Sequence, residues 1–446
     1  EHMSFVNCMH TPRGGSHVAL VASQLTKAIE EAVHKQGHSC TPQQIRNKLF
    51  VFLNCLVENP SFDSQTKEML TSKLSTMGPT AGFGPTFLKQ VTNSLGIVEE
   101  IIREQEDKEQ AALLRAAMQN KRKSTSTNLN VHVPKLEDAH LAGGPQASEC
   151  TLILTEGDSA KALAVAGLEV VGRDTYGVMP LRGKLLNVRD VSAKQLAANE
   201  EILNLCTAMG LDFNLTYEKP EDVKGLRYGK VMIMTDQDHD GSHIKGLLIN
   251  FFEHFWPSLL KQEGFLQQFI TPLVKATKGS DVQSFYSLQE FEQWQASLQG
   301  SDARGWRIKY YKGLGTSSAQ EAKEYFSNLD RHKKYFVASG KEHDVIDMVF
   351  NKHRAADRRQ WIEEHASRAD EAARFIDPTQ THVTFEEFVD RELIHFSNAD
   401  NVRSIPNVID GLKPSQRKVL FGCFKRKLAQ EVKVVQLADV PVTLVR

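Results

Sequence analysis

The 446 residues are enough for two or three domains, and the hydrophobic content of 41% and charged content of 24% are those of a globular protein. A formal net charge of −1 gives no overall bias toward nucleic acid, although a local basic surface is compatible with that balance. The six cysteines form no Cys-x-x-Cys pair, which excludes a zinc framework of that kind and indicates reduced thiols, and no apolar run is long enough to span a membrane.

Residues 4–92 combine helical and strand patterns. Val18 to His34 has apolar residues at helical spacing, and Leu49 to Val57 is a nearly continuous apolar run that predicts a buried strand. A loop rich in turn-forming residues follows, from Glu58 to Lys67. We expect an α/β domain over this range.

Residues 93–149 predict one long helix and a linker. The helix runs from about Ser94 to Lys123, and about 28 residues at 1.5 Å each would span roughly 40 Å. Its apolar stripe is incomplete, which is typical of a helix that connects domains or lies on a surface. The basic, polar stretch from Lys121 to Asn128 predicts a domain boundary.

Residues 150–330 contain two short apolar strands that end in acidic residues. Thr151–Thr155 precedes Glu156, with Ser159 as a candidate helix cap, and Lys230–Met234 precedes Asp236, Asp238 and Asp240. Ligand sites in open parallel sheets gather where such strands end. Three close carboxylates repel one another unless a divalent cation lies among them, and their hard oxygen atoms suit Mg²⁺ or Mn²⁺.

Three other interpretations of these acids are weaker. Asp-x-Asp-x-Asp-Gly also begins an EF-hand loop, but the twelfth position, which needs a bidentate Glu, is Leu247. His239 and His243 have the spacing of zinc ligands on a helix, but no Cys lies nearby, so we expect His243 to be structural or to face DNA. A solvated acidic turn is the commonest role of such a run, and the buried strand that precedes it argues against that role.

The last part of the chain is expected to be mainly helical. Residues 331–395 are charged, with Trp361 and Phe375 as the expected apolar anchors. In residues 396–446, Pro414 stands where a helix begins, and Arg417 and Lys418 follow on its first turns.

Four motifs together resemble a known family. Glu156-Gly157-Asp158-Ser159 paired with Asp236-x-Asp238-x-Asp240-Gly241 resembles the Toprim fold. The sequence around both motifs is similar to eukaryotic DNA topoisomerase II, a type IIA enzyme, in the stretches 180–188 (PLRGKLLNV), 235–243 (TDQDHDGSH), 311–317 (YKGLGTS) and 405–414 (IPNVIDGLKP). The resemblance covers nearly the whole chain but only the middle of the full enzyme.

The resemblance implies an α/β fold class with five parts. These are the C-terminal part of a transducer-like domain (4–92), a long connecting helix and linker (93–149), a Toprim domain with a parallel sheet (150–330), a charged helical connector (331–395), and the truncated start of a winged-helix domain (396–446).

The same resemblance implies an ATP-dependent enzyme that cleaves, passes and religates double-stranded DNA. A tyrosine of the enzyme attacks a DNA phosphate, and this chain would supply the metal site that assists this reaction. Glu156, Asp236 and Asp238 would hold Mg²⁺, with Mn²⁺ and Ca²⁺ as alternatives and Asp240 in support. Glu156 would also be the general acid–base for the 3′ oxygen, a role that needs a raised pKa.

Further residues acquire roles from the family pattern. The DNA contacts implied are Arg182, Lys184, Asn187, Lys312, Arg358, Arg359, Lys413 and Arg417. Gln65, Thr66 and Lys67 match the loop whose lysine reaches the terminal phosphate of ATP; no Gly-x-x-x-x-Gly-Lys-Ser/Thr loop is present, so ATP would be bound mainly by another domain. The full-length enzyme would be a nuclear homodimer that acts in chromosome segregation, with no membrane partner and with an organelle as the alternative location.

The chain departs from the family pattern after Ala438, where the family continues to a tyrosine that follows an arginine. None of the eight tyrosines lies in that context, so we expect this fragment to be inactive alone. Two alternatives stay open: another Toprim enzyme, such as a primase or nuclease, and a non-catalytic module that couples nucleotide state to a partner domain.

Overall fold

A computed structural model describes residues 1–73, 82–105, 108, 112–113, 116, 133–189, 191–298, 305–311, 313–367, 375–377, 379–435 and 437. The chain divides into two compact units, Glu1–Leu113 and Leu114–Arg446, and each is described by itself. Among the described residues no helix has the length and apolar character needed to cross a bilayer. The six cysteines all lie in the described part of the chain, and none of them forms a disulfide bond.

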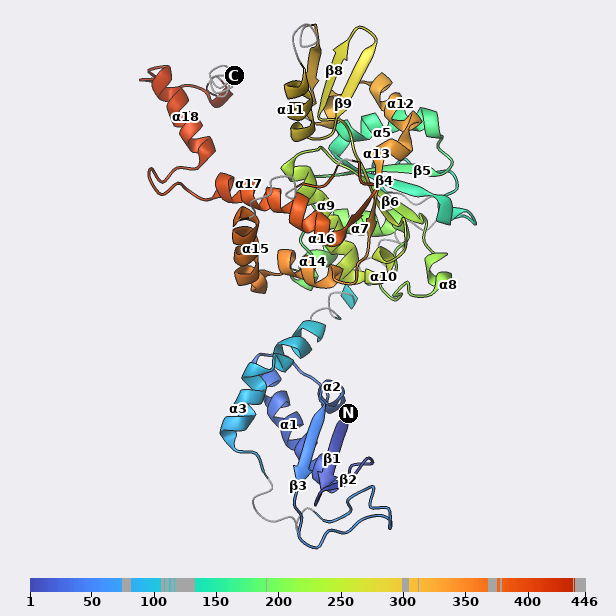
Figure 1. The fold of residues 1–446 in the computed structure, drawn as a ribbon, viewed down its shortest axis with the longest axis vertical. Helices are drawn as coiled ribbons and strands as arrows, with labels where there is room; N and C mark the ends of the chain where they lie inside the picture. The colour runs from blue at the N-terminus through green and yellow to red at the C-terminus, as the bar shows by residue number, and fades with distance from the viewer. Residues whose placement is uncertain are drawn as a thin grey trace. The chain divides into compact units, whose positions relative to one another are not determined.

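The first unit is a small sheet packed against helices (Figure 1). Strand β1 pairs in parallel with β3 and antiparallel with β2, in the order β2-β1-β3. Leu25, Ile29 and Val33 of the first helix form a core with residues of the other helices. The elements are β1 (His2–Val6), β2 (Met9–His10), α1 (Ser16–Lys35), α2 (Pro42–Asn47), β3 (Val51–Cys55) and α3 (Pro85–Ser94).

Two expectations for this unit need adjustment. The apolar run Leu49–Val57 gives only the five-residue β3, which is half-buried rather than buried: Phe52 is 67% exposed. The helix expected from about Ser94 is not continuous with the residues before it, because α3 ends at Ser94 and helical structure resumes at residue 97 and continues to 105. The linker 121–128 lies outside the described residues.

The second unit is built on a six-stranded sheet in the order β12-β11-β7-β6-β4-β5. The four strands from β5 to β7 run parallel, whereas β11 is antiparallel to β7, so the sheet is mixed. Its strands are β4 (Thr151–Glu156), β5 (Tyr176–Leu181), β6 (Lys230–Met234), β7 (Leu266–Phe269), β11 (Lys333–Val337) and β12 (His382–Thr384).

Helices cover both faces of this sheet, which is why residues 152–154 of β4 and 231–234 of β6 are apolar. Ile153 and Met232 belong to a core with α5 and α12, whereas Leu154 and Ile233 belong to the core of the opposite face, with α7, α9 and α14. In Figure 1, α5 and α12 lie on one side of the sheet and α7, α9 and α14 on the other. These helices are α5 (Gly157–Val171), α7 (Glu200–Met209), α9 (His239–Phe255), α12 (Ala319–Ser327) and α14 (Glu342–Phe350).

A second, three-stranded sheet in the order β10-β8-β9 packs with α11 around Phe285 and Phe291. It consists of β8 (Val274–Lys278), β9 (Asp281–Phe285), β10 (Arg307–Tyr310) and α11 (Leu288–Ser297). The remaining elements are η2 (Ala147–Glu149), α6 (Ala193–Ala197), α8 (Pro220–Val223), α10 (Pro257–Leu260), η4 (Leu314–Thr316), α13 (Leu329–His332), η5 (Lys352–Arg354), α15 (Ala355–Ser367), α16 (Phe385–Phe388), η7 (Val389–Leu393), α17 (Ile394–Ser404) and α18 (Pro414–Lys425).

The stretch 331–395 is not only helical, because it supplies β11 and β12 to the main sheet. Trp361 is buried as expected, but Phe375 is 44% exposed, so only the first is an anchor. Pro414 begins α18, as its sequence context predicts. The segment after Ala438 lies outside the described residues.

Candidate active site

The two acidic motifs meet at one edge of the main sheet. Strands β4 and β6 are adjacent and parallel, with Thr155 opposite Met234, so Glu156 and Asp236 emerge side by side. The backbone amide of Asp236 donates a hydrogen bond of 3.2 Å to Oε2 of Glu156. The predicted juxtaposition of the two strand ends is therefore confirmed.

Asp236 is fixed by two backbone segments from elsewhere in the chain. The Leu314 amide donates to its Oδ1 at 2.6 Å, and a Cβ on Gly313 would lie 2.2 Å from its Oδ2. A Cβ on Gly241 would lie 2.1 Å from its carbonyl oxygen. Both glycines are thus required by the close approach of Asp236.

Asp238 begins helix α9 as its cap, since its Oδ1 accepts the amide of Gly241 at 2.8 Å. In the motif Glu156-Gly157-Asp158-Ser159, the residue at the N-cap of the helix differs from the prediction. Helix α5 begins at Gly157 with Glu156 in the cap position and no side-chain cap, so Ser159 does not have that role.

Asp240 contacts two cations. Lys184 Nζ lies 2.7 Å from its Oδ1, and Arg403 Nη1 lies 3.3 Å from its Oδ2. Hydrogen bonds from Lys184 and then Arg403 lower the pKa of Asp240 below its usual range. Asp240 therefore stands apart from the other acids, because its charge is already compensated.

The pKa values of Glu156 and Asp236 are shifted in the opposite direction to that of Asp240. Burial raises the pKa of Glu156, and the charges of the neighbouring aspartates raise it further, against the opposing effect of the Asp236 amide. Burial likewise raises the pKa of Asp236, and Asp238 adds to this effect, against the Leu314 amide. The ionised forms of Glu156 and Asp236 are thus destabilised at this sheet edge, and a bound cation would stabilise them.

The donor set fits a hard divalent cation. All the acidic side chains here offer oxygen, the ligand atom that Mg²⁺ and Mn²⁺ prefer. Within the described part of the chain, however, no three His, Cys, Asp or Glu side chains converge closely enough to hold a metal. The acids are therefore brought to one place by the fold without forming a closed cage.

His243 was expected either to be structural or to face DNA, and its contacts in the structure are those of a packing residue. Its ring stacks on Phe396 with centroids 3.9 Å apart, and burial lowers its pKa to about 4. This half-buried ring is part of the packing between α9 and α17.

The predicted DNA contacts on the loop after β5 differ in availability. Arg182 is exposed, and Lys184 reaches Asp240 and also lies 4.7 Å above the Phe396 ring. Asn187 makes protein contacts: its amide donates to the carbonyl oxygen of Phe350 at 2.9 Å, and its Oδ1 accepts from Asn250 at 3.0 Å. Its proposed role toward DNA would have to compete with these bonds.

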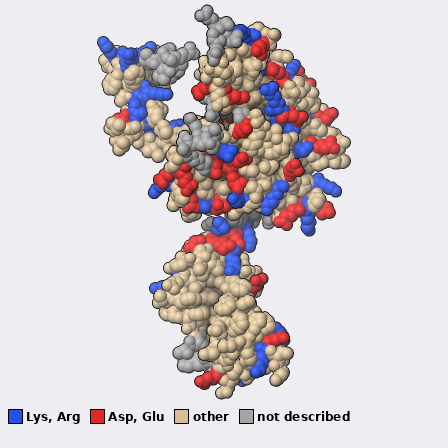
Figure 2. Space-filling view, in the orientation of Figure 1, with Lys and Arg blue, Asp and Glu red and all other residues tan. Residues whose placement is uncertain are grey.

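The remaining DNA-contact predictions lie further along the chain. Arg358 donates to the carbonyl oxygens of Met348 and Asn351, whereas Arg359 is exposed. Lys413 is exposed at the start of α18, where Arg417 pairs with Asp410 at 2.6 Å. Lys312 lies outside the described residues. Figure 2 shows Lys and Arg side chains gathered on α18.

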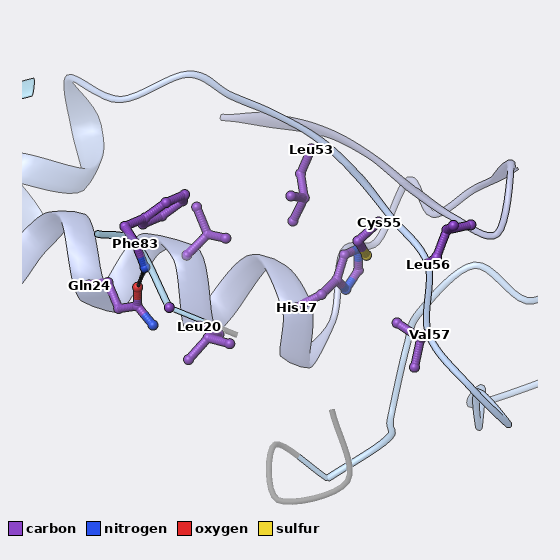
Figure 3. A pocket seen from close by; sticks show the side chains of 10 residues that line it. His17, Leu20, Gln24, Leu53, Cys55, Leu56, Val57 and Phe83 are labelled. Atoms are coloured by element: carbon purple, nitrogen blue, oxygen red, sulfur yellow. Dashed lines mark hydrogen bonds between the residues drawn. The ribbon is translucent and has the colours of Figure 1, made fainter. Parts of the chain in front are cut away.

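The predicted ATP loop lies in the first unit. Gln65, Thr66 and Lys67 are exposed, and Lys67 has a positive φ of 57°, with its amide donating to the carbonyl oxygen of Ser64 at 3.1 Å. A cavity of ≈ 320 Å³ in the same unit is lined by residues of α1, by residues of β3 and the segment that follows it, and by Gly82 and Phe83 (Figure 3). None of the three loop residues lines it.

Sequence reasoning misses three contributors to the site. It includes the Leu314 amide only as part of the motif 311–317, and it singles out neither Arg403 nor Glu392. Glu392 contacts Ser242 of α9, next to the acids. No local signal could identify these residues, because each is 78 or more positions from its partner.

Four protein families match successive parts of the chain, in the order that the sequence motifs predict. The family described as DNA gyrase B matches residues 1–122, the Toprim domain matches 151–269, the C-terminal associated domain of TOPRIM matches 269–401, and the DNA gyrase/topoisomerase IV A-subunit family matches 403–440.

Individual relatives are also similar over almost the whole chain. DNA topoisomerase 2-beta of Gallus gallus is 50% identical over 98% of this chain and 27% of its own length. DNA topoisomerase 2, mitochondrial, of Dictyostelium discoideum is 48% identical over 98% of this chain and 34% of its own length. The crystal structure of the Plasmodium falciparum topoisomerase II DNA-binding, cleavage and re-ligation domain matches with a TM-score of 0.63 and 52% identity, covering 71% of this chain and 42% of that one. The chain thus spans about a third or less of the curated relatives' length.

Proposed function

Since the chain belongs to the type IIA DNA topoisomerases, as a part of a eukaryotic topoisomerase II, we propose that it supplies the metal site at which the full enzyme cleaves and religates DNA. The observation that carries the proposal is the hydrogen bond between the Asp236 amide and Glu156, which joins the two acidic motifs at one sheet edge.

Glu156, Asp236 and Asp238 would hold Mg²⁺, with Mn²⁺ and Ca²⁺ as alternatives. A divalent cation there supplies charge stabilisation for the transferring phosphate and the leaving oxygen. Asp240 supports this site indirectly, because it positions Lys184 and Arg403 beside it.

Glu156 also moves a proton. In the chain without a metal, burial raises the pKa of Glu156, so its carboxyl group keeps a proton to a higher pH than an ordinary glutamate does; a cation bound to that carboxyl group would favour its charged form. Glu156 then gives that proton to the 3′ oxygen on cleavage and takes it back on religation. Proton transfer of this kind contributes about 10²–10⁴-fold to a rate.

DNA is bound by cationic side chains around this edge and on α18. Arg182, Lys184, Arg359 and Lys413 are exposed and suited to phosphates. Asn187, Lys312, Arg358 and Arg417 complete the proposed set. Because Arg417 is paired with Asp410, it would exchange that partner for a phosphate.

The full protein would be an ATP-hydrolysing homodimer. The terminal phosphate of ATP would be sensed by Gln65, Thr66 and Lys67. The rest of the ATP molecule would be bound by another domain. A nuclear location and a role in chromosome segregation complete the proposal, with an organelle as the alternative location.

The test uses the full-length protein that contains this chain. Glu156→Gln and Asp236→Asn should each reduce Mg²⁺-dependent cleavage of supercoiled plasmid on the order of 10²-fold or more, with duplex binding retained. Glu169→Gln is the matched control and should cleave normally, because it changes an exposed glutamate of α5 that pairs with Lys323 of α12. Normal cleavage by both site variants would contradict the proposal.

A further inference from the structure

A buried polar cluster beside the acids links helix α9 to the element that precedes α17. Glu392 accepts a hydrogen bond of 3.0 Å from Ser242 Oγ, and the same oxygen forms an ion pair with Lys245 Nζ. Ser242 and Lys245 are both buried, with exposed fractions of 8% and 3%. Lys245 also donates to Gln268 of β7 at 3.2 Å.

Glu392 reaches α9 from an unusual turn. It lies in η7, a π-helical turn between α16 and α17. A π turn is rare, and within helices it occurs frequently at functional sites. The packing there is close, since a Cβ on Gly246 would lie 3.2 Å from the Leu393 side chain.

Ser242 connects this cluster to the acidic motif. Its amide donates to the carbonyl oxygen of Asp238 at 3.1 Å, and its Oγ lies 3.2 Å from the same oxygen, so the single hydroxyl proton is shared between that carbonyl and Glu392. Asp238 in turn caps the helix through the Gly241 amide. Glu392 is therefore joined to the backbone that carries Asp238 by one intervening side chain.

We propose that Glu392 is a positioning residue for the divalent cation: through Ser242 and Lys245 it fixes the first turn of α9, and with it the orientation of the Asp238 carboxylate. The inference rests on the proposed metal site. Groups that orient metal ligands contribute strongly to affinity, and their loss typically costs 10–100-fold. The competing account is that Glu392 only neutralises the buried Lys245.

The experiment measures Mn²⁺ binding to the 446-residue chain without DNA, by the electron paramagnetic resonance signal of free Mn²⁺. Glu392→Ala should weaken binding about 10-fold. Glu392→Gln should weaken it less, because its amide oxygen still accepts the Ser242 hydrogen bond. Glu386→Gln is the matched control: this glutamate of the adjacent α16 contacts Ser339, and its change should leave binding unaltered.

A double variant separates positioning from stability. Glu392→Ala leaves Lys245 buried without a counter-ion, so thermal stability should fall; adding Lys245→Met should recover much of it. If Glu392 positions the site, the double variant still binds Mn²⁺ weakly; binding equal to that of the unaltered chain would overturn the inference.

Glu156→Gln distinguishes the inference from the function on which it rests. If Glu156→Gln weakens Mn²⁺ binding and Glu392→Ala does not, the inference alone is wrong. If Glu156→Gln leaves Mn²⁺ binding unchanged, the metal site is wrong and the inference falls with it.

Discussion

The Leu314 amide donates a 2.6 Å hydrogen bond to Oδ1 of Asp236, 78 residues earlier in the chain. This bond brings the Gly313 backbone so close that a Cβ there would lie 2.2 Å from the other carboxylate oxygen. The turn between β10 and α12 therefore determines where the Asp236 carboxylate lies.

Gly313→Ala should displace Asp236. The added methyl group has no room, so we expect a loss of about 1–3 kcal/mol in unfolding free energy together with weaker Mn²⁺ binding. Gly315→Ala is the control, because its Cβ would meet only Ser159 at an ordinary 3.6 Å. Urea unfolding and Mn²⁺ titration of both variants test this, and equal behaviour of the two would show that the close approach has no effect.

Asp240→Asn should increase the affinity of the chain for duplex DNA in EDTA several-fold. The reason is that Lys184, which pairs with Asp240, becomes available to phosphates, whereas Arg403 keeps its second partner, Asp400, at 2.9 Å. Fluorescence anisotropy with a labelled duplex at low salt measures the change. In a Lys184→Met background the gain should shrink, whereas an undiminished gain would indicate only reduced repulsion between Asp240 and DNA.

His243 should make stability depend on pH. Burial lowers its pKa to about 4, whereas the unfolded chain titrates near 6.5, so the unfolded state binds more protons between these values. Stability that is present above pH 6.5 is therefore lost as the pH falls toward 4, on the order of 2 kcal/mol after allowance for partial solvent access.

His243→Phe keeps the stacking on Phe396 and removes this titration. Tryptophan fluorescence during urea unfolding reports on the second unit, because Trp256, Trp294, Trp306 and Trp361 all lie there. The difference in unfolding free energy between the two proteins should grow as the pH falls from 6.5 to 4. A difference that stays constant over this range would contradict the prediction.

Arg189→Met should destabilise the second unit by about 3–5 kcal/mol. Arg189 pairs with Asp347 at 2.9 Å and with Glu253, whose side chain is only 1% exposed. Without it, Glu253 would be left with His343 at 2.6 Å and Asp347 with Arg354 at 3.6 Å, so two buried acids would each lose a cationic partner. Arg173→Met is the control: this half-exposed arginine pairs with Glu137 at 3.4 Å, and its loss should cost under about 1 kcal/mol. Urea unfolding that gives equal losses for the two variants would contradict this.

The sequence was sufficient to predict the two strands of the site. Both read as short apolar runs because helices cover both faces of the sheet, and the acids follow directly after them. The start of α18 was likewise predictable from Pro414, which suits the first turn of a helix.

Long-range contacts could not be predicted in this way. The runs that become β11 and β12 carry no signal that they pair with each other or with β7, so residues 331–395 gave only a helical expectation. Phe52 reads as buried because it is apolar, yet it lies on the exposed face of β3. The compensation of Asp240 by Lys184 and Arg403 depends on contacts across 56 and 163 residues.

The most direct test of the metal site is anomalous diffraction from crystals of this chain soaked in Mn²⁺. We expect one anomalous peak within ligand distance of the carboxylates of Glu156, Asp236 and Asp238, absent from crystals of Glu156→Gln. Strong Mn²⁺ peaks elsewhere, with none at the carboxyl ends of β4 and β6, would contradict the account.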